Sequence, residues 1–193
     1  STGVIGEQLP MDIIEAYIHQ HKPTNYKQTW SSFAKAIITT DTFLKGSYRE
    51  CYIGNQKVKI MGIAKGSGMI APNMATMLGF IFTDANLGKN VLKELLSEAA
   101  EKSFNRITVD NDMSTNDMVC FFSTKAINCG PIKSLNKKLL NQFKLSLEEV
   151  AIELAKKIIL DGEGAKKLIH IEVTGANTNN DAKNIAFAIA NSP

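Results

Sequence analysis

One stretch of this sequence is almost entirely apolar, and it restricts the possible folds more than any other feature. Residues 76–83 (TMLGFIFT) contain no charged side chain. A strand with one face in water alternates apolar and polar residues, whereas a continuous apolar run indicates a strand covered on both faces. We therefore expect a layered fold in which other elements pack on each side of this strand.

Strand-like and helix-like segments alternate along the rest of the chain. Apolar residues at helical spacing predict helices over residues 11–19, 27–38, 90–104 and 147–160. Strands are predicted over residues 49–54, 57–64, 106–109, 118–124 and 167–174, with a hairpin turn at Gly54-Asn55. Residues 182–190 fit either a helix or an apolar strand. No linker divides the chain, so a single α/β region over residues 1–193 is expected.

Composition excludes several classes of protein. The chain has 193 residues, of which 44% are hydrophobic, and a formal charge of +3. It is too apolar to be disordered, its apolar runs fall short of the roughly 20 residues that span a bilayer, and it has no basic block for nucleic acid. Cys51, Cys120 and Cys129 lack the spacing of a disulfide framework or a zinc site. With no visible signal peptide, we expect a cytoplasmic protein without a metal or a membrane partner.

The segment that leads into the apolar strand suggests chemistry. Residues 65–75 are rich in glycine and proline and deliver the Thr76 hydroxyl to the start of the strand. Such a loop can strain the Ala75–Thr76 peptide bond, so that an N→O acyl shift and hydrolysis leave Thr76 as a new N-terminus. The freed α-amino group, with a pKa of about 7.7–8.0, can then activate the hydroxyl as its base. The spacing alone favours the simpler interpretation, a Gly/Pro connection into a core strand.

The same segment resembles the autoprocessing site of the bifunctional ornithine/glutamate N-acetyltransferases of arginine biosynthesis. The resemblance extends in matching order and spacing to residues 1–6 (STGVIG), 9–11 (LPM), 38–42 (ITTDT), 108–117 (TVDNDMSTND) and 161–165 (DGEGA). It implies a layered sandwich of mixed sheets with flanking helices, similar to N-terminal-nucleophile enzymes. Because family members are about twice as long, the chain is expected to be the central part of such a protein.

The resemblance implies a covalent role for Thr76. This residue would be the nucleophile that takes the acetyl group as an ester, and cleavage after Ala75 would divide the chain into residues 1–75 and 76–193. Thr2 and Gly3 would stabilise the oxyanion, and one such donor is worth roughly 2.7–4 kcal/mol of barrier. Without the resemblance, Thr2 and Gly3 describe an ordinary turn.

Three further residues would bind substrate, according to the same resemblance. Thr42 would hydrogen-bond the amino-acid part, Lys65 would lie beside the reacting centre, and Glu163 would pair with an ammonium group. Each has a simpler interpretation: Thr42 as a helix-end cap, Lys65 as a solvated lysine at a strand end, and Glu163 as an exposed charge after a helix.

The implied reaction is a ping-pong transfer of acetyl from N2-acetyl-L-ornithine to L-glutamate through acetyl-Thr76, without a cofactor. Acetyl-CoA is a possible second donor, and the processed chains are expected to form a hetero-oligomer. Two alternatives stay open. One is an N-terminal-nucleophile aminopeptidase or amidase of related fold, and the other is a non-catalytic α/β binding domain with an intact chain.

The loop at residues 108–117 departs from the family pattern at two positions. Asn111 stands where the family has glycine, and Met113 replaces a threonine. Asparagine tolerates left-handed backbone angles, so Asn111 is a mild change, whereas Met113 removes a hydroxyl. The acidic residues Asp110, Asp112 and Asp117 invite a metal interpretation, but a turn-rich polar loop accounts for them.

Overall fold

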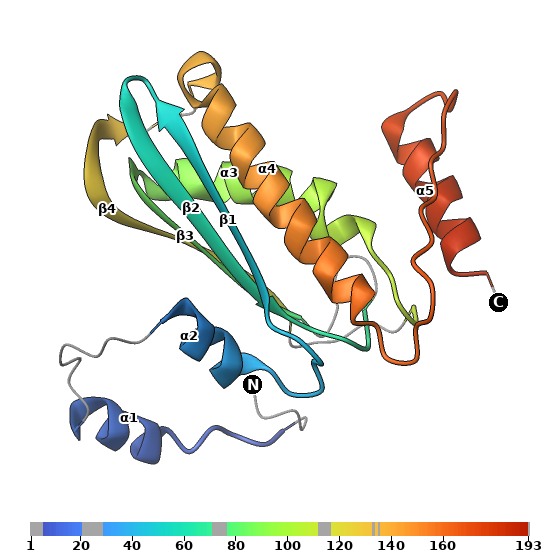
Figure 1. The fold of residues 1–193 in the computed structure, drawn as a ribbon, viewed down its shortest axis with the longest axis horizontal. Helices are drawn as coiled ribbons and strands as arrows, with labels where there is room; N and C mark the ends of the chain where they lie inside the picture. The colour runs from blue at the N-terminus through green and yellow to red at the C-terminus, as the bar shows by residue number, and fades with distance from the viewer. Residues whose placement is uncertain are drawn as a thin grey trace.

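A four-stranded mixed sheet forms the centre of the structure, a computed structural model that describes residues 6–20, 29–70, 77–111, 117–132, 134 and 136–192. Its strands are β1 (Lys45–Ile53), β2 (Gln56–Lys65), β3 (Leu78–Leu87) and β4 (Met118–Ile132), and they lie in this order across the sheet (Figure 1). β1, β2 and β3 pair antiparallel, and the β1–β2 hairpin turns at Gly54 as expected. β3 and β4 pair parallel. The predicted α/β class, with a mixed sheet and flanking helices, is therefore confirmed.

Two long helices, α3 (Lys89–Lys102) and α4 (Lys137–Leu160), cover one face of this sheet (Figure 1). Apolar side chains from the strands and both helices are fully buried between them, among them Val58, Ile60, Ile81, Leu95, Leu147 and Leu154. Gly62 on β2 allows α4 to approach closely, because a Cβ atom at this position would stand 2.7 Å from Leu154 Cδ1 and 2.8 Å from Val150 Cγ1. This tight layer fixes the ends of α4 relative to β1 and β2.

The other face of β3 carries aromatic side chains that meet the short helix α2 (Trp30–Ile37). The ring centroids of Phe33 and Phe80 are 5.3 Å apart, and those of Trp30 and Phe82 are 5.2 Å apart. Along β3, residues buried under α3 and α4 alternate with residues half-buried on the α2 side. The prediction that this strand is covered on both faces is confirmed for the part that begins at Leu78, and Thr76 lies outside the described residues.

Helices α1 (Met11–Gln20) and α5 (Asn179–Ala190) contain no buried residue. The helical alternative is correct for residues 182–190, because the Thr178 side chain caps α5 by accepting a hydrogen bond from the Asp181 N–H at 3.1 Å. No helix within the described residues is long and apolar enough to cross a membrane.

Two predicted strands are wrong. In the predicted strand at residues 106–109, Arg106 ends a short 3₁₀ turn (Phe104–Arg106), and residues 107–109 pair with no strand of the described sheet. Residues 167–174 form no strand, and Ile169 is 76% exposed. Alternating apolar residues suit a strand only where a neighbouring strand can pair with them, and the described part of the sheet reaches neither segment.

Several boundaries also differ from prediction. α4 begins at Lys137 rather than at residue 147, because the Asn136 side chain accepts a hydrogen bond from the Leu139 N–H and the buried stripe continues through Leu140 and Phe143. β1 begins at Lys45 rather than at residue 49. β4 continues to Ile132 rather than ending at residue 124, with register irregularities that a regular pattern does not reveal.

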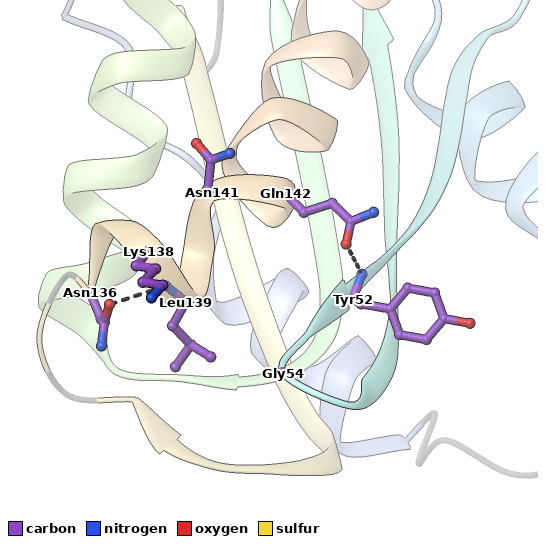
Figure 2. A pocket seen from close by; sticks show the side chains of 7 residues that line it. All are labelled: Tyr52, Gly54, Asn136, Lys138, Leu139, Asn141 and Gln142. Carbon is purple, nitrogen blue, oxygen red and sulfur yellow. Dashed lines mark hydrogen bonds between the residues drawn. The ribbon is translucent and has the colours of Figure 1, made fainter.

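An open hollow lies beside the hairpin turn, between β1 and the start of α4. Its volume is about 520 Å³, and Figure 2 shows its lining of uncharged polar and aliphatic groups with one lysine, namely Tyr52, Gly54, Asn136, Lys138, Leu139, Asn141 and Gln142. The Gln142 side-chain oxygen accepts a hydrogen bond from the Tyr52 N–H at 3.2 Å. This end of the sheet, which we call the hairpin end, is opposite the edge described next.

Candidate active site

The strand ends opposite the hairpin end, which we call the sheet edge, bring together residues from three strands. Lys65, the last residue of β2, pairs with Leu78 at the start of β3, and Leu78 pairs with Met118 at the start of β4. The parallel β3–β4 pairing thus brings Met77 and Asp117, which precede these two strands, to the same edge. Met77 is the covalent neighbour of Thr76. Thr76 itself, Ala75, Thr2 and Gly3 lie outside the described residues.

The Asp117 side chain accepts a hydrogen bond from the backbone at this edge. Its Oδ1 atom accepts a hydrogen bond from the Met77 N–H at 2.8 Å. Burial raises the pKa of Asp117 to about 6, although the Met77 hydrogen bond and the positive charge of Lys65 oppose the rise. Lys65 is half-buried, and its Nζ atom lies 3.5 Å from the Thr39 hydroxyl.

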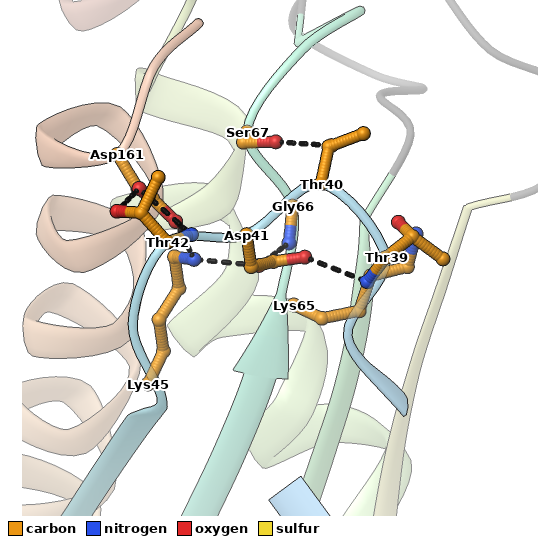
Figure 3. A network of polar contacts seen from close by, with 9 residues as sticks. All are labelled: Thr39, Thr40, Asp41, Thr42, Lys45, Lys65, Gly66, Ser67 and Asp161. Atoms are coloured by element: carbon orange, nitrogen blue, oxygen red, sulfur yellow. Dashed lines mark hydrogen bonds and ion pairs between the residues drawn. The ribbon is translucent and has the colours of Figure 1, made fainter. Parts of the chain in front are cut away.

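A dense polar network stands next to this edge, where the connection from α2 to β1 meets the end of α4 (Figure 3). The Thr42 N–H donates to Asp161 Oδ2 at 3.0 Å, and the Thr42 hydroxyl donates to Asp161 Oδ1. Helix α2 ends at Ile37, so Thr42 does not cap it. Because the hydroxyl hydrogen of Thr42 is taken, the group that this residue can offer a ligand is a lone pair on its oxygen.

Lys45 lies at the centre of the network. Its Nζ atom is 2.5 Å from Asp41 Oδ1 and 2.5 Å from Asp161 Oδ2, and all three side chains are at most 2% exposed. Burial alone would raise the pKa of Asp161, but hydrogen bonds from Lys45 and Thr42 outweigh it and lower the pKa. The pKa of Asp41 is lowered in the same way, by the Gly66 N–H and Lys45 acting against burial. One lysine between two ionised aspartates leaves a net negative charge in this buried cluster.

The turn at residues 66–68 joins the network to the sheet edge. The Gly66 N–H donates to Asp41 Oδ1 at 2.7 Å, and the Ser67 and Thr40 hydroxyl oxygens are 2.7 Å apart (Figure 3). The Ser67 carbonyl accepts a hydrogen bond from the Glu163 N–H at 2.7 Å. Gly66 has φ +149°, a backbone conformation that L side chains rarely adopt. The turn is therefore hydrogen-bonded to residues 40–41 and to residue 163, both of which are distant from it in the sequence.

Glu163 and Asp110 place further carboxylates beside this turn. The exposed Glu163 side chain lies against Gly68, where a Cβ atom would come within 3.3 Å of its Oε2. Asp110 accepts hydrogen bonds from the Met69 N–H at 2.6 Å and the Ile70 N–H at 2.9 Å. The next residue, Asn111, has φ +61°. Asn111 therefore adopts the left-handed backbone conformation that asparagine is expected to tolerate.

The fold brings the three separate segments that carry Thr42, Lys65 and Glu163 to the turn at residues 66–68. The described residues contain no group of histidine, cysteine or acidic side chains arranged to hold a metal ion. Sequence reasoning missed Asp41 and Asp161, although both belong to the motifs at 38–42 and 161–165. It also missed Lys45, and it had assigned Asp117 to a turn-rich polar loop without a role at the site. No sequence signal marks Lys45, because a lysine in a strand is ordinarily exposed.

Comparisons with known proteins agree along the whole chain. The model of the ArgJ family matches residues 1–193. An arginine biosynthesis bifunctional protein ArgJ from Gluconobacter oxydans is 48% identical over 193 residues, which are 100% of this chain and 46% of that protein. The protein of the same name from Bacillus cereus is 49% identical over 192 residues, 100% of this chain and 47% of its own length. This chain therefore spans about half the length of these relatives.

A solved structure is similar as well. The crystal structure of the arginine biosynthesis bifunctional protein argJ from Bacillus halodurans superposes with a TM-score of 0.52 and 40% sequence identity. The superposition covers 56% of this chain and 51% of that one.

Proposed function

Because this chain belongs to the ArgJ family, we propose that it carries the nucleophile and part of the substrate site of an enzyme that moves acetyl from N2-acetyl-L-ornithine to L-glutamate. The observation that carries this proposal is the match to arginine-biosynthesis bifunctional proteins over all of residues 1–193. The sheet edge supports it, since the register of β2, β3 and β4 gathers Lys65 and Asp117 beside the residue bonded to Thr76.

The reaction begins with a cut between Ala75 and Thr76. The Thr76 hydroxyl attacks the Ala75 carbonyl, and water hydrolyses the resulting ester, which gives residues 1–75 a new carboxylate and residues 76–193 a new α-amino group. That amine takes the proton of the Thr76 hydroxyl as the hydroxyl attacks the acetyl carbonyl of the donor. Ornithine leaves with a proton on its nitrogen, and the acetyl ester then passes to the amino group of glutamate.

The remaining roles follow the charge of each group. N–H and hydroxyl donors at Thr2 and Gly3 stabilise the oxyanion of each tetrahedral intermediate. Lys65, half-buried at the sheet edge, lies beside the reacting centre. The lone pair of Thr42 accepts a hydrogen bond from the amino-acid part of the substrate, and the exposed carboxylate of Glu163 pairs with an ammonium group.

The setting of the enzyme belongs to the same proposal. The substrates are small molecules, no cofactor is needed, and acetyl-CoA serves as a second acetyl donor in the bifunctional form. The two processed chains stay together in a hetero-oligomer, which works in the cytoplasm without nucleic acid or membrane.

Intact-mass analysis and an ornithine-release assay of the full-length protein test this function. Wild type should be found as two pieces that meet between Ala75 and Thr76, and it should release ornithine from N2-acetylornithine only when glutamate is present. Thr76→Ala should stay uncut and inactive, whereas Thr76→Ser should retain some cutting. Thr124→Ala removes an exposed threonine from β4 and should behave as wild type.

Other results would select a different function. Cutting with a turnover that ignores glutamate would identify an amidase. A single uncut species in the wild type would leave a binding domain and exclude the nucleophile mechanism.

A further inference from the structure

Asp161 accepts hydrogen bonds from both donors of Thr42. The Thr42 N–H donates to Asp161 Oδ2 at 3.0 Å, and the Thr42 hydroxyl donates to Asp161 Oδ1 (Figure 3). An ionised carboxylate only accepts hydrogen bonds, so the hydroxyl hydrogen of Thr42 is directed at Asp161. Thr42 itself is exposed. What this residue presents to a ligand is therefore an oxygen whose hydrogen is already used.

Lys45 fixes the charge and the orientation of Asp161. Its Nζ atom lies 2.5 Å from Asp161 Oδ2, and both side chains are at most 2% exposed. On its other side, the same Nζ atom lies 2.5 Å from Asp41 Oδ1, which also accepts the Gly66 N–H at 2.7 Å. Because an ammonium group has donors only, the carboxylate oxygen that faces it has to be an acceptor. Asp161 Oδ1 is consequently the oxygen that meets the Thr42 hydroxyl.

Burial makes this hydrogen-bond direction hard to reverse. Asp161 directly follows α4, and its N–H donates to the Ile158 carbonyl at 3.1 Å, so the carboxylate is anchored at a helix end. A threonine hydroxyl in water rotates to donate or to accept, as a ligand requires. Rotation of the Thr42 hydroxyl away from Asp161 would take a donor from a buried carboxylate, which is costly. Thr42 is therefore exposed to a ligand as an acceptor only.

We propose that Asp161 is a positioning residue of the substrate site, which holds the Thr42 hydroxyl as an acceptor and thereby selects a donor whose acetyl group is carried by an N–H. This inference rests on the proposed function, which assigns the amino-acid part of the substrate to Thr42 and its ammonium group to Glu163. The carboxylate of N2-acetylornithine has no hydrogen to donate, so the N–H of the acetyl amide is the donor left for Thr42. An ester oxygen in its place would face a lone pair and be rejected.

The test compares two acetyl donors that differ at this one group. They are N2-acetylornithine and the O-acetyl ester of the matching hydroxy acid, in which an oxygen atom replaces the amide nitrogen. Both yield N-acetylglutamate when the full-length protein transfers their acetyl group to glutamate, and mass spectrometry measures this product. The quantity of interest is the ratio of the two kcat/KM values, amide over ester. Because an ester is intrinsically easier to cleave, the ratio is compared between variants.

Asp161→Asn should lower this ratio about tenfold. Lys45 attracts the side-chain oxygen of the asparagine, so its NH₂ group takes the place of Oδ1 and donates to the Thr42 oxygen. The hydroxyl hydrogen of Thr42 is then free to donate to an ester. In a Thr42→Val background, Asp161→Asn should change the ratio no further, because the hydroxyl through which it acts is gone. A merely structural role would lower both kcat/KM values together, and an unchanged ratio would overturn the proposal.

Thr42→Val decides the question even where Asp161→Asn does not fold. It removes an exposed hydroxyl but keeps the N–H that donates to Asp161. The kcat/KM for the amide should fall about tenfold, whereas that for the ester should not fall. A hydroxyl free to donate or to accept would serve both donors, so equal losses would contradict the proposal.

Three variants serve as controls for the ratio. Thr42→Ser keeps the hydroxyl and should keep the wild-type ratio. Thr124→Val changes an exposed threonine of β4, and Asp84→Asn changes a carboxylate that accepts the Lys59 N–H, and neither should alter the ratio. If wild type forms no N-acetylglutamate from N2-acetylornithine, the proposed function itself fails, and the two failures are thereby distinguished.

Discussion

The two ends of the sheet are built differently, although β1, β2 and α4 meet at both. At the hairpin end an open hollow of about 520 Å³ has three amide side chains among its seven lining residues and no buried ion pair in its lining (Figure 2). At the other end, Lys45 and two aspartates are buried in full hydrogen-bond contact beside Thr42 and the turn at 66–68 (Figure 3). Burying charge is costly unless every partner is in place. The charged end therefore depends on more specific contacts than the hairpin end, where the hollow lies.

The strongest test of this contrast removes the buried cation. Lys45→Met leaves Asp41 and Asp161 buried without their shared partner, and we expect a loss of about 3–5 kcal/mol in the free energy of unfolding. Urea denaturation followed by circular dichroism measures it. The loss should shrink when Asp41→Asn and Asp161→Asn are added, since the cluster then carries no charge.

The matched control lies on the same strand. Arg49→Met removes an exposed partner of Glu149 and Glu153, and exposed pairs contribute less than about 1 kcal/mol. Equal losses in Lys45→Met and Arg49→Met would show that the charged end is no more demanding than any other part of β1.

A smaller effect is expected at Glu163, to which the proposed function assigns substrate binding. Glu163→Gln keeps the shape of the side chain but removes its attraction for an ammonium group, so the KM for N2-acetylornithine should rise about tenfold with little change in stability. Steady-state kinetics measure this change. Glu172→Gln, an exposed glutamate farther along the chain, should leave KM unaltered; a similar rise there would remove the case for a local role of Glu163.

Asp117 should respond to pH with the opposite sign to the aspartates around Lys45. Its pKa is raised from 3.8 to about 6 in the folded protein, so the folded state binds more protons than the unfolded state between these values and stability falls as pH rises through them. Asp117→Asn should therefore gain about 1 kcal/mol at pH 7–8, after allowance for solvent screening. The gain should vanish below about pH 4, where both states are protonated.

Thermal unfolding across this pH range checks the sign. A variant that is less stable than wild type at neutral pH would show that the ionised carboxyl is stabilising. Asp41 and Asp161, whose pKa values are lowered, instead contribute stability that is lost as pH falls below about 4.

The smallest effect is expected at the hairpin end. Gln142→Ala removes one exposed hydrogen bond to the Tyr52 N–H, which should cost less than about 1 kcal/mol and leave acetyl transfer unchanged. Urea denaturation and the ornithine-release assay measure both. A loss of acetyl-transfer activity in this variant would contradict the contrast between the two ends, because it would show that the hollow contributes to the reaction.

Periodicity and motifs predicted much of this molecule because they report on local interactions. The apolar run after Thr76 located β3, and the stripe through Leu147 and Leu154 located the second half of α4. Residues 167–174 show the limit of this reasoning, since alternation describes the faces of a segment but not whether another strand lies beside it.

The candidate site was predicted in part, for a similar reason. Thr42 and Glu163 came from motifs, and the fold does place the segments that carry them at one turn. The groups that hold this turn together were missed, because Lys45 and Asp161 acquire their roles only when β1 meets the end of α4. Their sequence separation leaves no spacing signal, and a charged residue in an isolated segment is normally assigned to the surface.

The position of β2 beside β3 decides what a cut before Thr76 would do to the body of the protein. The first piece would contribute β1 and β2, and the second would contribute β3, β4 and α4. A backbone ladder from Ile60–Thr83 to Lys65–Leu78 crosses the seam, and α4 reaches back over it to cover β1 and β2. After such a cut the two pieces would remain one folded unit, and they would dissociate only when the sheet itself unfolds.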